Sequence, residues 1–304
     1  MVSFDARKDI PSLEGKVVLV TGGNIGLGKQ CVLDYARHNP AQIWLACRSP
    51  DKAKDAIEEI QQQLPTPANI RVLELDLSSL TSVKSAATRF LSEASRLDIL
   101  MLNAGIMGSA PGLTTDGYEV QFGVNYLGHA LLAKLLHPLL EKTSKLPNTS
   151  VRALMVSSTG HKMTPAKGIQ FADLKTECAS LGAFERYGQS KLANVLWAKH
   201  AASLYPNIKF VSPHPGLVST NLANSSSGAS SIWKVALTIA PWFAQTPEKG
   251  ARNQLWASVG DGVKSGEYYE PIGVSGRTSA LGKDEELAKR LWEWTERELE
   301  SWVV

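Results

Sequence analysis

The chain has 304 residues, of which 43% are hydrophobic and 20% are charged, and its formal net charge is +3. This length suits one large α/β domain or two small ones, and the apolar fraction is ample for a core. The small charge and the scattered basic residues give no surface that tracks phosphates, so we expect no nucleic-acid partner. The three cysteines lack metal-ligand spacing, which argues against a structural metal site and favours a reducing compartment.

The organisation of the chain is that of one domain spanning residues 1–304, because the sequence has no repeat, no linker and no second core. No stretch approaches the length of a membrane span, and the first residues lack the apolar centre of a signal peptide. We therefore expect a cytoplasmic protein without a membrane span.

Apolar runs bounded by turn residues predict six buried strands, and helical patterns separate them. The strands are expected at residues 16–21, 43–47, 71–75, 99–102, 151–156 and 209–212. The helices are expected at residues 27–37, 51–62, 82–95, 118–140 and 184–204. This alternation predicts an α/β fold: a single doubly wound (Rossmann) parallel sheet of about seven strands with helices on both faces. Such sheets bind ligands at the carboxyl ends of their strands.

The pattern changes after the sixth strand. A Ser/Asn/Gly-rich stretch at 221–231 and an apolar, Trp-bearing stretch at 232–243 predict a substrate lid around residues 217–245, whose aromatic side chains either contact an apolar substrate or only dock the segment on the protein. Thr246 and Pro247 are typical of the N-cap and first position of a helix. Residues 266–269 are a candidate seventh strand. An amphipathic helix at 284–302 is expected to close the chain, packing on the sheet or on a neighbouring subunit.

A glycine-rich turn follows the first strand and opens the first helix. Gly22, Gly26 and Gly28 would let the backbone approach a pyrophosphate, whose charge a helix N-terminus stabilises. Any tight strand-to-helix turn also favours glycine, but the position after the first strand favours a dinucleotide. The second strand ends with Cys47 where NAD sites usually carry an acid, and Arg48 follows. The arginine, together with the missing acidic residue, suits a ribose 2′-phosphate and therefore NADP(H). The alternative is that Arg48 is an ordinary surface arginine that does not bind the cofactor.

The spacing of Tyr187 and Lys191 places both on one face of a helix. A neighbouring ammonium favours phenolate and would lower the tyrosine pKa by roughly one to three units. The pair could then exchange a proton with an alcohol or carbonyl oxygen. Taken alone, the spacing also fits a solvated pair on a helix surface.

The histidines are too far apart in sequence, and lack acidic partners at ligand spacing, for a metal site, so we expect none. Ser158 lacks the turn of a hydrolase nucleophile. His161 follows Ser158 by three residues and either lines the substrate entrance or caps a loop.

Together these motifs resemble those of the short-chain dehydrogenase/reductase family, in the right order from Gly15 to about Tyr269. Some runs are similar to the retinol-dehydrogenase-like branch, which also includes WW-domain oxidoreductases. The matching segments are Thr21–Gly28, Asp76-Leu77, Asn103-Ala104-Gly105, Asn125, Ser157-Ser158, Tyr187/Lys191 and Pro215-Gly216.

The resemblance implies a role for each matching residue. Tyr187 would be the general acid and base, Lys191 would lower the Tyr187 pKa and hold the nicotinamide ribose, and Ser158 would bind the substrate oxygen. Asn125 would complete a proton relay to water. The residues implied to bind the cofactor are Gly22, Asn24, Ile25, Gly26, Leu27, Gly28, Arg48, Asp76, Leu77, Asn103, Ala104, Gly105, Tyr187, Lys191, Pro215, Gly216, Val218 and Thr220.

The expected function is an NADP(H)-dependent oxidoreductase that interconverts a carbonyl and an alcohol on a mainly apolar small molecule, in the reductive direction. Two alternatives stay open: a non-redox isomerase, cyclase or dehydratase on the same scaffold, and a protein that senses NADP(H) without chemistry. The resemblance is also compatible with a homo-oligomer.

Overall fold

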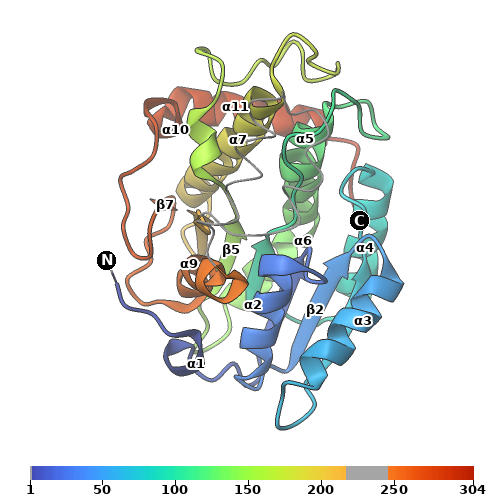
Figure 1. Cartoon of the computed structure of the whole chain (residues 1–304), viewed down its shortest axis with the longest axis vertical. Coiled ribbons are helices and arrows are strands. Elements are labelled where there is room, and N and C mark those ends of the chain that lie inside the picture. Colours follow the sequence, from blue (N-terminus) through green and yellow to red (C-terminus); the bar gives the residue numbers. More distant parts are fainter. Residues whose placement is uncertain (1, 217–245) are drawn as a thin grey trace.

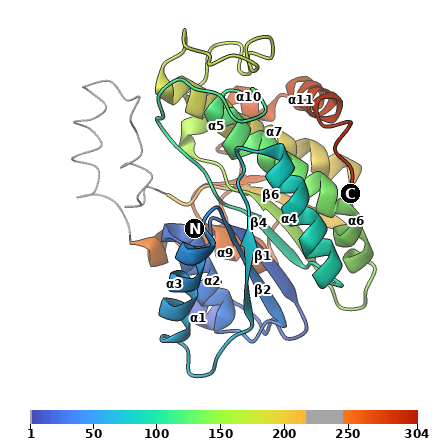
Figure 2. The same cartoon turned by 90° about the vertical axis from the view of Figure 1, so that its right-hand side faces the viewer.

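A sheet of seven parallel strands forms the centre of the computed structural model, which describes residues 2–216 and 246–304. The strand order is β3-β2-β1-β4-β5-β6-β7 (Figures 1 and 2). The strands are β1 (Val17–Thr21), β2 (Gln42–Cys47), β3 (Ile70–Glu74), β4 (Ile99–Leu102), β5 (Val151–Met155), β6 (Ile208–Pro213) and β7 (Tyr268–Tyr269). The doubly wound sheet predicted from the apolar runs is confirmed.

The strand order creates a switch point between β1 and β4. From β1 the chain winds outward through β2 to β3, and it then returns to form β4 on the other side of β1. The loops that follow β1 and β4 therefore run in opposite directions and leave a crevice at the carboxyl ends of these strands. The glycine-rich turn follows β1, and residues 103–105 follow β4.

One face of the sheet is covered by α2 (Gly26–Ala36), α3 (Pro50–Gln61) and α9 (Pro247–Val259) (Figure 2). The short helix α1 (Ala6–Asp9) adds to the same apolar cluster. The predicted N-cap of α9 is confirmed, because the Thr246 side chain accepts a hydrogen bond from the Lys249 N–H.

The opposite face is covered by α4 (Leu80–Glu93), α6 (Gly128–Ser144), α7 (Ala183–Leu204) and α11 (Glu285–Glu298) (Figure 1). The closing helix α11 packs on α7, with Leu291 and Trp294 buried in the shared core. It ends four residues before the predicted 302, and it lies in the helical layer rather than on the sheet itself.

The long helix predicted over residues 118–140 is interrupted. A short α5 (Val120–Phe122) leads into a π-helical turn, η1 (Gly123–Leu127), before α6 begins. Thr114 from the preceding loop packs against this turn, since a Cβ on Gly123 would lie only 2.3 Å from its Cγ2 atom. The wider π turn frees backbone groups from the ordinary helical pattern, and it places Asn125 inside the molecule.

Other differences are local. The seventh strand is only two residues long, and the short elements α1, η2 (Thr159–Lys162) and α10 (Ala280–Lys283) were not predicted. Strand and helix limits otherwise differ from the predicted ones by a few residues, as expected for frayed ends. None of the described helices is long and apolar enough to cross a bilayer.

Candidate active site

The glycine-rich turn after β1 leaves no room for side chains at two of its positions. A Cβ on Gly28 would lie 2.2 Å from the Gly22 carbonyl oxygen and 2.7 Å from the Asn103 Nδ2. Gly22 has a φ of +67° and lies against Ala104, which is the left-handed region that glycine tolerates. Ile25, the N-cap of α2, makes no side-chain capping bond. The first N–H groups of α2 therefore receive no hydrogen bond from the side chain of their cap residue and remain able to bind an anion.

The loop after β4 is fastened to the end of β1. The backbone N–H groups of Asn103 and Ala104 donate to Thr21 Oγ1 at 2.9 and 3.0 Å, and Asn103 Nδ2 donates to the Thr21 carbonyl at 2.9 Å. Gln254 on α9 donates to Asn103 Oδ1 at 3.1 Å. Both sides of the crevice are thus held in one rigid arrangement. Gly105, the next residue of this loop, packs against Asn125.

The end of β2 carries the residues expected to select the cofactor. Cys47 is buried, and the following Arg48 is exposed. At the end of β3, Asp76 Oδ1 accepts from the Ser78 N–H and hydroxyl at 2.9 and 2.7 Å, which fixes the turn there. Leu77 is buried and lies against α6, because a Cβ on Gly128 would approach its carbonyl oxygen to 2.6 Å.

Tyr187 and Lys191 lie four residues apart on α7, and both side chains are buried. Lys191 Nζ lies 5.7 Å from the centroid of the Tyr187 ring and donates to the Val156 carbonyl at 3.1 Å. Burial lowers the pKa of Lys191 to about 8. Burial also raises the pKa of Tyr187, and a hydrogen bond with Ser158 opposes this only in part. The predicted lowering of the Tyr187 pKa is wrong, because desolvation outweighs the stabilisation of the phenolate.

The two serines that follow β5, Ser157 and Ser158, make different hydrogen bonds. Ser157 is buried, and its Oγ donates to the Lys191 carbonyl at 2.7 Å. Ser158 is half-buried, lies close enough to Tyr187 to oppose the rise of its pKa, and accepts from the Gly160 N–H at 3.0 Å. Ser158 is therefore the member of the pair that lies beside the Tyr187 hydroxyl.

Asn125 lies in the π-helical turn and is fully buried. Its Oδ1 accepts from the Ile106 N–H at 2.8 Å, while its Nδ2 donates to the Ile106 carbonyl and to Ser190 Oγ, each at 2.9 Å. Both amide hydrogens are used, so the side chain clamps the loop after β4 to α7. Gly105 is packed here, since a Cβ on it would lie 3.0 Å from Asn125 Oδ1 and 3.5 Å from Lys191 Nζ.

His129, on the first turn of α6, links the two halves of the site. Its Nδ1 lies 3.0 Å from the Asn125 carbonyl and its Nε2 lies 2.8 Å from Thr21 Oγ1. A carbonyl only accepts, so Nδ1 carries the proton and Nε2 accepts from the threonine hydroxyl. Burial lowers the pKa of His129 to about 3, which keeps the ring neutral.

The loop after β6 completes the described part of the site. The His214 carbonyl accepts from Asn253 Nδ2 at 2.7 Å, and Pro215 and Gly216 follow, the glycine with a φ of +87°. Val218, Thr220 and the predicted lid at 217–245 lie outside the described residues.

The comparisons with known proteins agree with this geometry. The short chain dehydrogenase profile matches residues 16–170. The short-chain dehydrogenase/reductase drtF of Aspergillus calidoustus is 38% identical over 305 residues, which cover 95% of each chain. The chain belongs to the short-chain dehydrogenase/reductase family. Human retinol dehydrogenase 11 is 36% identical over 96% of this chain and 88% of its own length, so the similarity to the retinol-dehydrogenase-like branch is confirmed.

Solved structures agree on the fold. An uncharacterised protein of Mycobacterium paratuberculosis superposes with a TM-score of 0.73 at 28% identity, covering 97% of each chain. The Pseudomonas aeruginosa RhlG/NADP complex superposes with a TM-score of 0.65 at 20% identity, covering 86% of this chain and 96% of the other. As a member of the short-chain dehydrogenase/reductase family, the chain is an oxidoreductase that acts on a small molecule with a nicotinamide cofactor.

The sequence did not predict that three buried residues belong to this site. They are His129, Ser190 and Gln254. Each acts through one or two hydrogen bonds to residues that are distant in the chain. Lys29, which follows Gly28, forms an ion pair with Glu59. No motif could signal contacts of this kind.

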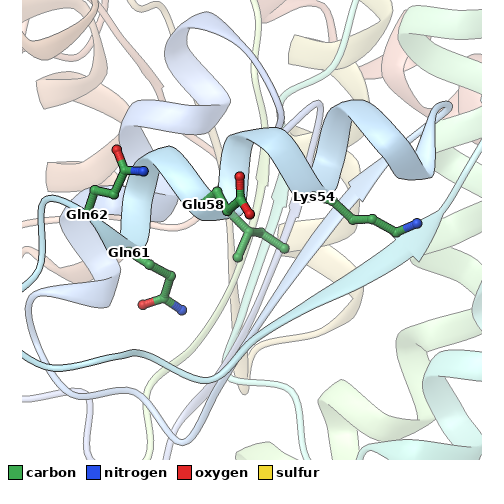
Figure 3. Close-up of a pocket in the computed structure, with 5 residues that line it drawn as sticks. Lys54, Glu58, Gln61 and Gln62 are labelled. Carbon is green, nitrogen blue, oxygen red and sulfur yellow. The ribbon is translucent and has the colours of Figure 1, made fainter.

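One surface depression lies apart from these residues. It is lined by side chains of α3 and of its C-cap residue (Figure 3). The residues concerned are Lys54, Ile57, Glu58, Gln61 and Gln62. All are exposed or half-buried, and none belongs to the convergent set around Tyr187, so this hollow has no part in the chemistry considered below.

Proposed function

We propose that the protein is an NADP(H)-dependent carbonyl reductase, in which Tyr187 is the general acid and base. The observation that carries the proposal is the convergence of Tyr187, Ser158 and Lys191 beside the loop after β4, which packs against the glycine-rich turn. All three come from elements fixed by the sheet, namely α7 and the end of β5. Chemistry of this kind requires donors held rigidly where the oxygen charge changes.

The residues at the turn fit a dinucleotide. Gly28 and Gly22 let the turn pack so closely that a Cβ at either position would press on neighbouring protein atoms, and the N-terminus of α2 can stabilise a pyrophosphate there. When bound, a nicotinamide cofactor supplies the hydride. Asn103 would border its adenosine ribose, and Asp76 with Leu77 would border its adenine, as the family resemblance implies.

The preference for NADP(H) over NAD(H) rests on the end of β2. Cys47 stands where a ribose-binding carboxylate would be needed, and the exposed Arg48 follows it directly. A guanidinium binds a phosphate through paired, charge-assisted hydrogen bonds, whereas it gains little from a 2′-hydroxyl. The RhlG protein, which shares the fold, was solved as a complex with NADP.

The protonation state of Tyr187 suits reduction. Because burial raises its pKa, the phenol carries its proton at neutral pH and can donate it to a carbonyl oxygen that gains hydride. Ser158, which lies beside Tyr187, would donate to the same oxygen. Lys191 would orient the nicotinamide ribose. Asn125 would contribute to a proton relay through its main chain, because both of its amide hydrogens are used.

The substrate is proposed to be a mainly apolar ketone or aldehyde. The relatives include proteins named retinol dehydrogenase, and retinol is an apolar alcohol. The predicted lid segment also contains Trp, Leu and Ile with few charges, which suits an apolar ligand.

The test is a titration of the purified protein with NADPH and NADH, followed by a screen for NADPH oxidation with bulky ketones and aldehydes. We expect tighter binding of NADPH than NADH and turnover of at least one carbonyl. Tyr187→Phe serves as the control for chemistry at this site. Binding of NADPH without turnover of any carbonyl would refute the reductase and favour a non-redox or sensing role.

A further inference from the structure

His161 is fully buried in the turn η2, three residues after Ser158. Its Nδ1 lies 2.7 Å from the Ser158 carbonyl, and its Nε2 accepts a hydrogen bond from the Ser279 N–H at 3.1 Å. Because a backbone N–H only donates and a carbonyl only accepts, both bonds require the neutral ring with its proton on Nδ1. The ring therefore joins the Ser158 turn to the segment that precedes α10.

The surroundings of this ring fix its place. It packs edge-on against Tyr268 of β7, with 4.7 Å between ring centroids. The Tyr268 hydroxyl donates to Glu270 Oε2 at 3.0 Å, and Lys162 pairs with the same carboxylate at 3.6 Å. These contacts leave the imidazole no free rotation.

The same turn packs against the aromatic ring of Tyr187. A Cβ on Gly160 would lie 2.7 Å from Tyr187 Cε1, and the Gly160 N–H donates to Ser158 Oγ at 3.0 Å. The Ser158 carbonyl accepts from both the backbone N–H and the ring of His161. The orientation of Ser158 Oγ toward Tyr187 thus depends on a turn that His161 holds from two sides.

We propose that His161 is a positioning residue for the carbonyl reduction, holding the Ser158 turn so that the serine hydroxyl stays beside the Tyr187 side chain. This inference rests on the proposed function of Ser158 and Tyr187. His161 itself takes no proton and touches no reacting atom. It also makes the segment before α10, which lies beyond the residues matched by the family profile, part of the support of the site.

Two substitutions separate the hydrogen bond from the packing. In His161→Asn, the amide nitrogen takes the place of Nδ1 and keeps the bond to the Ser158 carbonyl, but the ring is lost. In His161→Phe, the ring contact with Tyr268 remains and both hydrogen bonds are lost. If the bond positions Ser158, asparagine should retain kcat within ~10-fold of wild type. Phenylalanine should lower kcat by ~100-fold, the cost of a misplacement of about 1 Å.

Further measurements distinguish positioning from a general structural role. NADPH affinity should be unchanged in both variants, because the glycine-rich turn is not touched. In a Ser158→Ala background, His161→Phe should lower kcat no further. His137→Phe is the matched control, since that half-buried histidine packs on Tyr205, and it should leave kcat unchanged.

Amide hydrogen exchange gives a readout that needs no substrate. His161→Phe should speed exchange in peptides that contain residues 158–163 and Ser279, whereas His137→Phe should not. Unchanged exchange, a phenylalanine variant at least as active as the asparagine variant, or additive losses with Ser158→Ala would each overturn the proposal. A wild-type protein that binds NADPH but reduces no carbonyl would refute the proposed function instead, and exchange alone would then decide whether His161 holds the turn.

Discussion

Replacing Lys191 by methionine is expected to stabilise the fold while removing activity. Burial lowers the pKa of Lys191 from 10.5 to about 8, and one pKa unit corresponds to ~1.4 kcal/mol, so the ammonium costs the folded protein ~3 kcal/mol at neutral pH. Methionine follows the same unbranched path without charge. The Val156 carbonyl keeps its second donor, Asn194 Nδ2, at 2.9 Å. After subtraction of ~1 kcal/mol for the lost hydrogen bond, Lys191→Met should gain ~2 kcal/mol in unfolding free energy at pH 7.

The pH dependence of this gain tests its cause. Because the folded-state pKa lies below the unfolded one, the unfolded chain binds more protons between pH 8 and 10.5, and wild-type stability rises with pH in that window. The advantage of Lys191→Met should therefore shrink by ~2 kcal/mol between pH 8 and 9.5. Urea unfolding followed by tryptophan fluorescence measures the difference in unfolding free energy between Lys191→Met and wild type at each pH. Lys289→Met, at an exposed lysine, is the control. An advantage that does not change with pH would refute the reasoning.

Three further predictions concern the proposed chemistry. Tyr187→Phe should lower kcat by ~100-fold or more, since no other general acid replaces the phenol, while NADPH affinity measured by fluorescence titration stays near wild type. Arg48→Asp should weaken NADPH binding by ~10–100-fold through the lost charged hydrogen bonds and favour NADH; an unchanged preference in the same titration would exclude Arg48 as the selector. Gly28→Ala should weaken NADPH binding by at least ~10-fold, since its Cβ would lie 2.2 Å from the Gly22 oxygen and such overpacking costs ~1–3 kcal/mol. Gly262→Ala, with no atom within 4 Å, is its control, and equal binding by both variants would count against the proposed pyrophosphate site.

The layers of the fold could be predicted because the strands are continuous apolar runs, buried on both faces. β1 and β5 are buried along their whole length, so their sequences alone indicate a parallel sheet under two layers of helices. The π-helical turn could not be predicted in this way. It depends on Thr114 packing against Gly123, a contact between segments that local helix propensity does not describe.

The same distinction between local sequence patterns and contacts of distant segments applies to the residues of the site. The residues proposed to take part directly in the chemistry, such as Tyr187 and Lys191, are visible in the sequence as a spacing, and the structure places them together as that spacing requires. Their electrostatics were not visible, because a spacing carries no information on burial, and burial reverses the expected direction of the Tyr187 pKa. His161 was left between two interpretations by the sequence, and the structure shows it fully buried and capping its loop.

The cofactor side and the proton-transfer side of the site form a single hydrogen-bonded framework. The Thr21 hydroxyl at the end of β1 donates to His129, and His129 donates to the Asn125 carbonyl. The Asn125 amide donates to Ser190 Oγ, and that hydroxyl donates to the Tyr187 carbonyl at 2.7 Å. Every link is buried, so each bond is protected from competing water and costly to leave unmade. A hydride donor bound at the proposed dinucleotide site would therefore be held in a fixed relation to the helix that carries Tyr187, which is the preorganisation that hydride and proton delivery to one carbonyl requires.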